Sequence, residues 1–245
     1  MSPSAPIRPR AVLFDAGNTL MRMNYRAIAG HLEGRGRAMA VDAIEEAELR
    51  ARVRLDADLA RGVSTEGRTA QDLYLVYLLE GLDISDPDEI DAAARFRRSY
   101  NAPAGLFNVP DRHALAAIRM LKTAGLVAGV VSNSNGCAGA LLAGAGLGAE
   151  LDFVVDSAIV GVEKPDPKIF RMGLERAGVH AREAVYIGDL YSVDVLGSRA
   201  AGLGAILLDP RGFWGPRDCD TARDLVEAVG LVLDPTWGSI RKDTT

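Results

Sequence analysis

Continuous runs of apolar residues recur along the chain, and each run ends at a polar residue or a glycine. Unbroken runs of this kind are typical of strands that are buried on both faces of a sheet. The predicted strands are Ala11 to Phe14, Leu126 to Val131, Phe153 to Val155, Ala184 to Ile187 and Ala205 to Leu208. Helical patterns separate the last four, over Ala138–Leu147, Pro167–Ala177 and Val193–Ala201. This alternation predicts an α/β fold with a doubly wound, Rossmann-like parallel sheet between helices.

The segment between the first two predicted strands has a different pattern. Residues 21–103 contain no strand-like run, and Val41–Arg61 and Thr69–Leu82 place apolar residues at helical spacing. Asp86-Pro87 suits the start of a further helix. We therefore predict an α/β core domain of residues 1–20 and 104–245. A small all-helical domain of residues 21–103 is inserted after the first strand.

Composition narrows the possible functions. The chain has 245 residues, 48% hydrophobic and 25% charged, which is typical of a globular protein. Its net charge of −5 argues against nucleic-acid or anionic-membrane partners, although a small phosphorylated substrate is compatible with it. The two cysteines, Cys137 and Cys219, form no CxxC pair, so neither a disulfide framework nor a zinc site is expected.

The N-terminus lacks a signal-peptide pattern, which favours a cytoplasmic protein. We expect a monomer or a homodimer.

Chemically notable residues follow the predicted strands, at the edge where open parallel sheets bind ligands. Asp15 follows the first strand. Its carboxylate can cap a turn, or it can attack phosphorus and form an aspartyl-phosphate, which divides hydrolysis into two steps. Ser132 and Asn133 follow the second strand. They suit a helix N-cap, or they can direct a hydroxyl and backbone N–H groups at an anion.

A lysine and two further carboxylates stand later in the chain. Lys164, in Glu163-Lys164-Pro165, is either a solvated loop lysine or a compact ammonium that pairs with a carboxylate and a phosphoryl oxygen. Asp189 and Asp194 lie across a strand-to-helix turn, where Asp194 also suits the first turn of a helix. Asp15 and Asp189 on neighbouring strands would gather like charges, which need a cation. Mg²⁺ suits such a cluster because it takes oxygen ligands.

Taken in order, these four motifs resemble the signature of the haloacid dehalogenase-like hydrolases, in the phosphatase-like branch with a helical cap. The resemblance covers residues 11–20 and about 108–208, and the helical insert stands where that family has its cap domain. It implies a Mg²⁺ cofactor and a small phosphorylated substrate. It implies catalytic roles for Asp15, Ser132 and Lys164, of which Asp15 is the nucleophile. It implies phosphate binding by Ser132, Asn133 and Lys164, and magnesium binding by Asp15, the Gly17 carbonyl, Asp189 and Asp194.

The chain departs from this pattern at Gly17. Phosphatases of the family usually carry a second aspartate there, which protonates the leaving group and then activates water. Loss of such a general acid-base typically costs ~10²–10⁴ in rate. The 2-haloacid dehalogenases also lack this aspartate, but they generally lack the Gly188-Asp189 pair as well. The phosphonoacetaldehyde hydrolases need a lysine in the cap, and residues 21–103 contain none. The hypothesis is a magnesium-dependent phosphatase. The alternatives are a 2-haloacid dehalogenase and a non-catalytic relative that binds a phosphorylated ligand.

Overall fold

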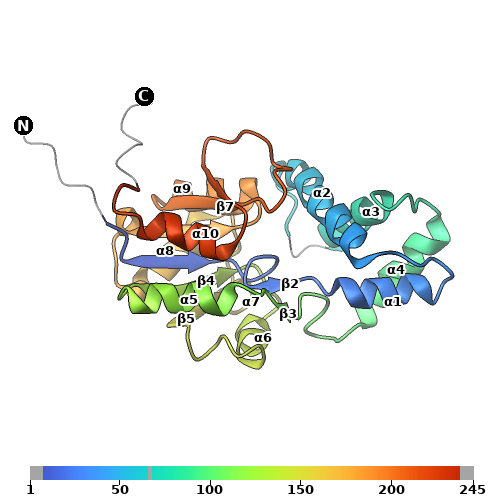
Figure 1. Ribbon diagram of the computed structural model, residues 1–245, viewed down its shortest axis with the longest axis horizontal. Helices are drawn as coiled ribbons and strands as arrows, with labels where there is room; N and C mark the ends of the chain where they lie inside the picture. Colours follow the sequence, from blue (N-terminus) through green and yellow to red (C-terminus); the bar gives the residue numbers. More distant parts are fainter. Residues whose placement is uncertain (1–7, 66–67, 238–245) are drawn as a thin grey trace, which may run out of the picture.

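A six-stranded parallel sheet forms the centre of the larger part of the molecule (Figure 1). The computed structural model describes residues 8–65 and 68–237. The strand order is β5-β4-β1-β6-β7-β8, and every neighbouring pair is parallel. The bounds are β1 Ala11–Phe14, β4 Val127–Ser132, β5 Phe153–Asp156, β6 Ala184–Gly188, β7 Gly204–Leu208 and β8 Asp220–Ala222. The predicted doubly wound parallel fold is therefore confirmed, with β1 at its centre.

Helices cover both faces of this sheet, as the unbroken apolar strands require. Side chains alternate along β1, so that Val12 and Phe14 belong to the apolar cluster that α5 and α10 complete. Ala11 and Leu13 belong to the cluster on the opposite face, which α8 completes. These helices are α5 Ala114–Thr123, α8 Pro167–Ala177 and α10 Leu225–Leu233. The shorter ones are α6 Ala138–Gly144, α7 Ser157–Val160, α9 Leu196–Ala200, the 3₁₀-helix η1 Ala181–Glu183 and the π-helix η2 Tyr191–Val195.

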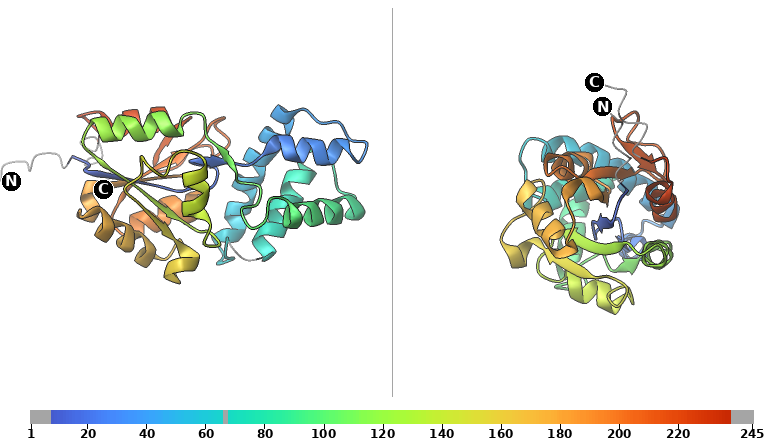
Figure 2. Two further views of the ribbon diagram at one scale, coloured as in Figure 1. Left: turned by 90° about the horizontal axis from the view of Figure 1, so that it is seen from below. Right: turned by 90° about the vertical axis from the view of Figure 1, so that its left-hand side faces the viewer.

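Four helices lie beyond one end of the sheet, and we call them the cap (Figure 2, left). They are α1 Tyr25–Glu33, α2 Val41–Leu59, α3 Arg68–Glu80 and α4 Pro87–Ser99. They have an apolar cluster of their own, in which Ile44 and Leu79 are almost completely buried. Asp86 caps α4 by accepting from the backbone N–H groups of Asp88 and Glu89, as the sequence predicted for this helix start. Among the described residues, no helix is both long and apolar enough to cross a lipid bilayer.

The structure differs from the prediction in several local elements. Met21–Arg22 form the short strand β2, which pairs antiparallel with β3, Val109–Pro110, although residues 21–103 were expected to be all-helical. A strand of two residues is too short to show an alternation of apolar and polar residues in the sequence. The helix predicted over 193–201 begins instead as the π-helix η2. The division of the chain into domains remains a prediction, and its ends at 1–7 and 238–245 lie outside the described residues.

Candidate active site

The register of the sheet brings two of the predicted carboxylates to the same edge. Phe14, the last residue of β1, lies opposite Val130 of β4 and Ile187 of β6. The chain of Asp15 continues in register, because its N–H donates to the Ile187 carbonyl at 3.0 Å. Asp15 and Asp189 therefore leave neighbouring strands side by side. A cavity of about 490 Å³ opens here, and its lining includes Asp15, Gly17, Ser132, Asn133, Lys164 and Asp189.

Lys164 is the centre of the hydrogen-bond network in this site. It is 4% exposed, so it is not the solvated loop lysine of the alternative interpretation. Its Nζ donates to Asp15 Oδ1 at 2.7 Å, to Asp194 Oδ1 at 2.8 Å and to the Tyr186 hydroxyl at 3.0 Å. These contacts use all three N–H donors of the ammonium. Tyr186 was not predicted, because a tyrosine within a buried strand reads as a core residue.

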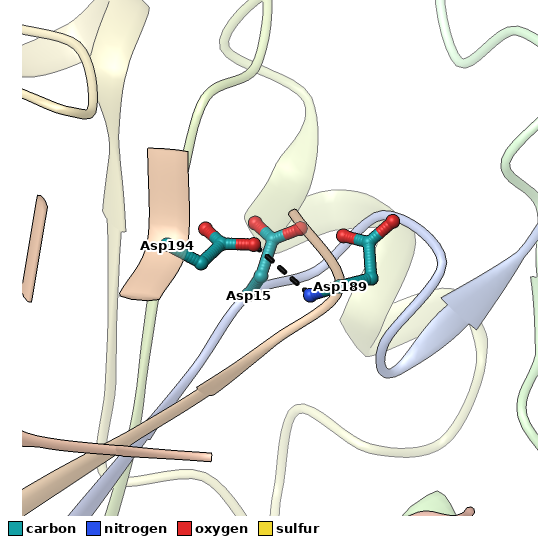
Figure 3. Close-up of side chains that lie close together, drawn as sticks. All are labelled: Asp15, Asp189 and Asp194. Carbon is teal, nitrogen blue, oxygen red and sulfur yellow. Dashed lines mark hydrogen bonds between the residues drawn. The ribbon is translucent and has the colours of Figure 1, made fainter. Parts of the chain in front are cut away.

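Three buried carboxylates lie close together in this site (Figure 3). Asp15, Asp189 and Asp194 offer oxygen atoms that all lie within 4.8 Å of one another. Asp194 also shapes the turn, because its Oδ2 accepts from the backbone N–H groups of Asp189 at 3.0 Å and Leu190 at 2.9 Å. Gly188 permits this approach, since a Cβ at that position would lie 2.4 Å from Cγ of Asp194.

Burial makes these charges interdependent. Burial raises the pKa of Asp15, and the nearby Lys164 ammonium opposes that rise. Burial also raises the pKa of Asp189 well above its usual range, although the guanidinium of Arg52 acts in the other direction. Burial alone would lower the pKa of Lys164, but Asp15 and Asp194 raise it well above its ordinary value. Lys164 is therefore protonated at neutral pH. Additional positive charge nearby would further stabilise the ionised form of the carboxylates beside it.

Ser132 and Asn133 also lie at this site, but their surroundings differ. Ser132 is 2% exposed and lines the cavity. The side chain of Asn133 instead holds the loop of Lys164, accepting from its backbone N–H at 2.7 Å and donating to its carbonyl at 2.9 Å. Asn133 Nδ2 also donates to Thr65 Oγ1 at 2.7 Å. Asn133 thus ties two core loops and the segment after α2 together, which the sequence motif did not indicate.

The cap contributes charged residues that sequence reasoning missed. Arg52 of α2 lines the cavity, and its Nη1 lies 3.2 Å from Asp189 Oδ2. Asp56, one turn later on α2, accepts from the backbone N–H of Ser192 at 2.8 Å. The signal in the sequence is the four-residue spacing of Glu48, Arg52 and Asp56, which places them on one helix face.

Comparison with known proteins agrees with this fold. A family model described as haloacid dehalogenase-like hydrolase matches residues 9–202. The chain therefore belongs to this family of hydrolases, as its four motifs predicted. The structure is similar to a magnesium-bound HAD hydrolase of Bacillus subtilis, with a TM-score of 0.65, 20% identity and coverage of 92% and 99% of the two chains. It is also similar to the L-2-haloacid dehalogenase RSc1362, with a TM-score of 0.60 and 20% identity over 92% and 99% of the chains.

Relatives in sequence carry the names of phosphatases and of haloacid dehalogenase-like hydrolase domain-containing proteins. Phosphoglycolate phosphatase of Rhodospirillum rubrum is 31% identical over 205 residues, 82% of this chain and 79% of that protein. Human haloacid dehalogenase-like hydrolase domain-containing protein 3 is 27% identical over 206 residues, 81% of either chain. Matches to the mouse and zebrafish proteins of this name, 44% and 45% identical, cover only 34% and 35% of those proteins.

The donor set at this site fits the divalent metal that the family implies. Carboxylate oxygens are the hard ligands that Mg²⁺ prefers, and the described residues bring three carboxylates within 4.8 Å. Lys164 pairs with Asp15 and Asp194, and Arg52 pairs with Asp189 but is also paired with Glu48. The residues that would hold Mg²⁺ are Asp15, Asp189 and the backbone carbonyl of Gly17, with Asp194 beside them.

Proposed function

We propose that the protein is a magnesium-dependent phosphatase that hydrolyses a small phosphorylated substrate through an aspartyl-phosphate on Asp15. The observation that carries the proposal is the 2.7 Å contact between Lys164 Nζ and Asp15 Oδ1, inside a cluster that also contains Asp189. The names of the relatives support this substrate class, since they include phosphoglycolate phosphatase and phosphoserine phosphatase. We further propose that residues 21–103 act as the cap over this site.

The proposed reaction has two steps, and several residues of this chain take part in them. A carboxylate oxygen of Asp15 attacks phosphorus, and the bond from phosphorus to the leaving oxygen breaks, with the electron pair leaving on that oxygen. Water then attacks the phosphorus of the aspartyl-phosphate, and the bond from phosphorus to the Asp15 oxygen breaks with its electron pair on that oxygen. This restores the Asp15 carboxylate, and inorganic phosphate leaves with the oxygen and protons of the water. Lys164 holds Asp15 in place and presents positive charge to the phosphoryl oxygens. The hydroxyl of Ser132 binds the phosphoryl group.

Asp194 and Asn133 act as supports in this scheme. Asp194 anchors Lys164 and the turn of Asp189 at the same time. Asn133 fixes the backbone of Lys164 from the other side. Bound Mg²⁺ would supply further positive charge for the phosphoryl group and neutralise the carboxylate cluster.

One observation favours a second candidate function. Gly17 provides no acid for the leaving group, and a 2-haloacid dehalogenase needs none because halide leaves without a proton. In that reaction Asp15 attacks carbon rather than phosphorus. Asp189 counts against it, because this carboxylate lies within the cluster and would suit a metal that dehalogenation does not require.

The test is a screen for phosphate release over a panel of phosphorylated metabolites, with Mg²⁺ and with EDTA. We expect release with Mg²⁺, little release with EDTA, and none from Asp15→Asn. Asp91→Asn, an exposed carboxylate on α4, is the matched control and keeps full activity. Chloride release from a 2-haloacid without Mg²⁺ would establish the dehalogenase instead. If ligands bind but nothing turns over, the protein is the non-catalytic relative.

A further inference from the structure

Helix α2 carries a buried stripe of charged side chains. Glu48, Arg52 and Asp56 follow one another at four-residue intervals, which places them on one face of the helix. Their exposed fractions are only 0%, 2% and 8%. Charged side chains are almost never buried to this degree unless they are paired. The stripe is therefore a docking surface of the cap.

This stripe meets both core loops that carry the predicted metal ligands. Glu48 Oε1 accepts from Nδ2 of Asn18, in the loop after Asp15, at 3.1 Å. Arg52 lies 3.2 Å from Asp189 Oδ2. Asp56 accepts from the backbone N–H and the hydroxyl of Ser192 at 2.8 Å and 2.7 Å. Ser192 belongs to the turn between Asp189 and Asp194, so the cap holds this turn at two points.

Arg52 is held in place within the cap itself. Its guanidinium makes a two-pronged contact with Glu48, from Nε at 2.9 Å and from Nη2 at 2.6 Å. The hydroxyl of Tyr25 donates to the same carboxylate at 2.7 Å. The charge of Arg52 is therefore matched by Glu48, which limits its repulsion of a cation near Asp189. Arg52 therefore acts on the site mainly through its directional contact with the Asp189 carboxylate.

We propose that Arg52 is a positioning residue of the metal site, which fixes the carboxylate of Asp189 from the cap. The affinity for Mg²⁺ is then coupled to the docking of α2 on the turn of residues 189–194. This inference rests on the proposed function, which assigns Asp189 to Mg²⁺. Partners that orient a metal ligand are typically worth ~10–100-fold in metal affinity. Because coupling is reciprocal, bound Mg²⁺ also strengthens the docking of the cap.

The test compares two ion pairs on the same helix. The double variant Glu48→Gln with Arg52→Gln removes the buried pair without changing the net charge of the site. The control is Arg54→Gln with Glu80→Gln, because Arg54 also pairs from α2 but its side chain is 57% exposed. Calorimetry measures Mg²⁺ affinity. Hydrogen exchange follows the backbone amides of α2 and of residues 189–194, with and without Mg²⁺.

We expect the buried-pair variant to bind Mg²⁺ ~10–100-fold more weakly and the exposed-pair variant to bind it as the wild type does. Mg²⁺ should slow exchange in α2 of the wild type and of the control but not in the buried-pair variant. Arg52→Lys provides a second test if the double variant does not fold. An ammonium cannot hold Glu48 and Asp189 through a planar fork, so affinity falls about tenfold.

Three outcomes would overturn the inference. Mg²⁺ affinity within twofold of wild type in the Arg52 variants would show that the contact only packs the cap against the core. Tighter binding would show that Arg52 competes with the cation for Asp189. Either result leaves the proposed phosphatase intact. A wild type that binds no Mg²⁺ would overturn both the inference and the proposed metal site.

Discussion

A Cβ atom at residue 17 would lie 3.8 Å from Cδ1 of Phe107, an ordinary van der Waals contact. Gly17 is not among the glycines with positive φ, so a side chain there meets no backbone strain. An aromatic ring therefore lies next to the position where the family's phosphatases carry their acid-base. The site accepts a Cβ atom at the position where the sequence provides no carboxyl group.

Gly17→Asp should restore this acid-base. In the wild type we expect acyl and aryl phosphates to turn over measurably and alkyl phosphates slowly, because residue 17 cannot donate a proton to the leaving oxygen. The substitution should raise kcat/KM for alkyl phosphates by at most ~10²–10⁴. Gly17→Asn is the matched control, since its amide cannot exchange a proton at neutral pH. Efficient alkyl phosphate hydrolysis by the wild type would show that the proton comes from another group.

Asp189→Ala should remove most of the affinity for Mg²⁺. The carboxylate is 3% exposed and belongs to the cluster that needs a cation, so the loss should exceed the ~10–100-fold typical of a residue that only orients a ligand. Titration calorimetry in chelator-treated buffer measures the change, with Asp91→Asn as the control. Undiminished affinity in Asp189→Ala would place the metal elsewhere.

Lys164→Met should impair both catalysis and stability. Loss of the positive charge that faces the phosphoryl group should lower kcat by ~10²–10³. Because Asp15 and Asp194 then lose their buried partner, unfolding in EDTA should become easier by about 3–5 kcal/mol. For a chain of this size that corresponds to a fall in Tm of about 6–20 °C. Lys168→Met changes an exposed lysine four residues later and should have little effect on either quantity. An unchanged Tm for Lys164→Met would contradict the role of Lys164 in neutralising the cluster.

Gly173→Ala should destabilise the contact of α8 with the sheet. A Cβ at this position would lie 2.7 Å from Cγ2 of Val131, closer than real Cβ atoms approach, and 3.0 Å from Cδ1 of Leu13, which is also a tight contact. Overpacking of this kind typically costs about 1–3 kcal/mol. The control is Gly230→Ala in α10, where a Cβ meets nothing within 4 Å and helix propensity should add about 0.5–1 kcal/mol. Urea unfolding of both variants measures the two changes, and equal effects would argue against this close packing.

The sequence by itself determined the elements whose signals are local. Unbroken apolar runs located five of the six strands of the sheet to within one residue at each end. Asp86-Pro87 marked the start of α4, and Pro167–Ala177 was predicted with its observed bounds, because capping and helical periodicity depend on neighbouring residues. Four motifs in a fixed order were enough to predict the family. For the strands and helices, the physical cause lies within a few residues of its signal.

Only the tertiary structure decided which distant groups meet. The sequence does not indicate that Glu48, Arg52 and Asp56 are buried, since charged residues normally face water. Docking of α2 on the loop after β1 and on the turn after β6 buries them, and their partners in these loops are Asn18, Asp189 and Ser192. Likewise the side chain of Asn133 binds the backbone of Lys164, 31 residues away, and no local pattern encodes that contact. Burial and pairing across such separations depend on how the elements pack, so they are properties of the folded chain as a whole.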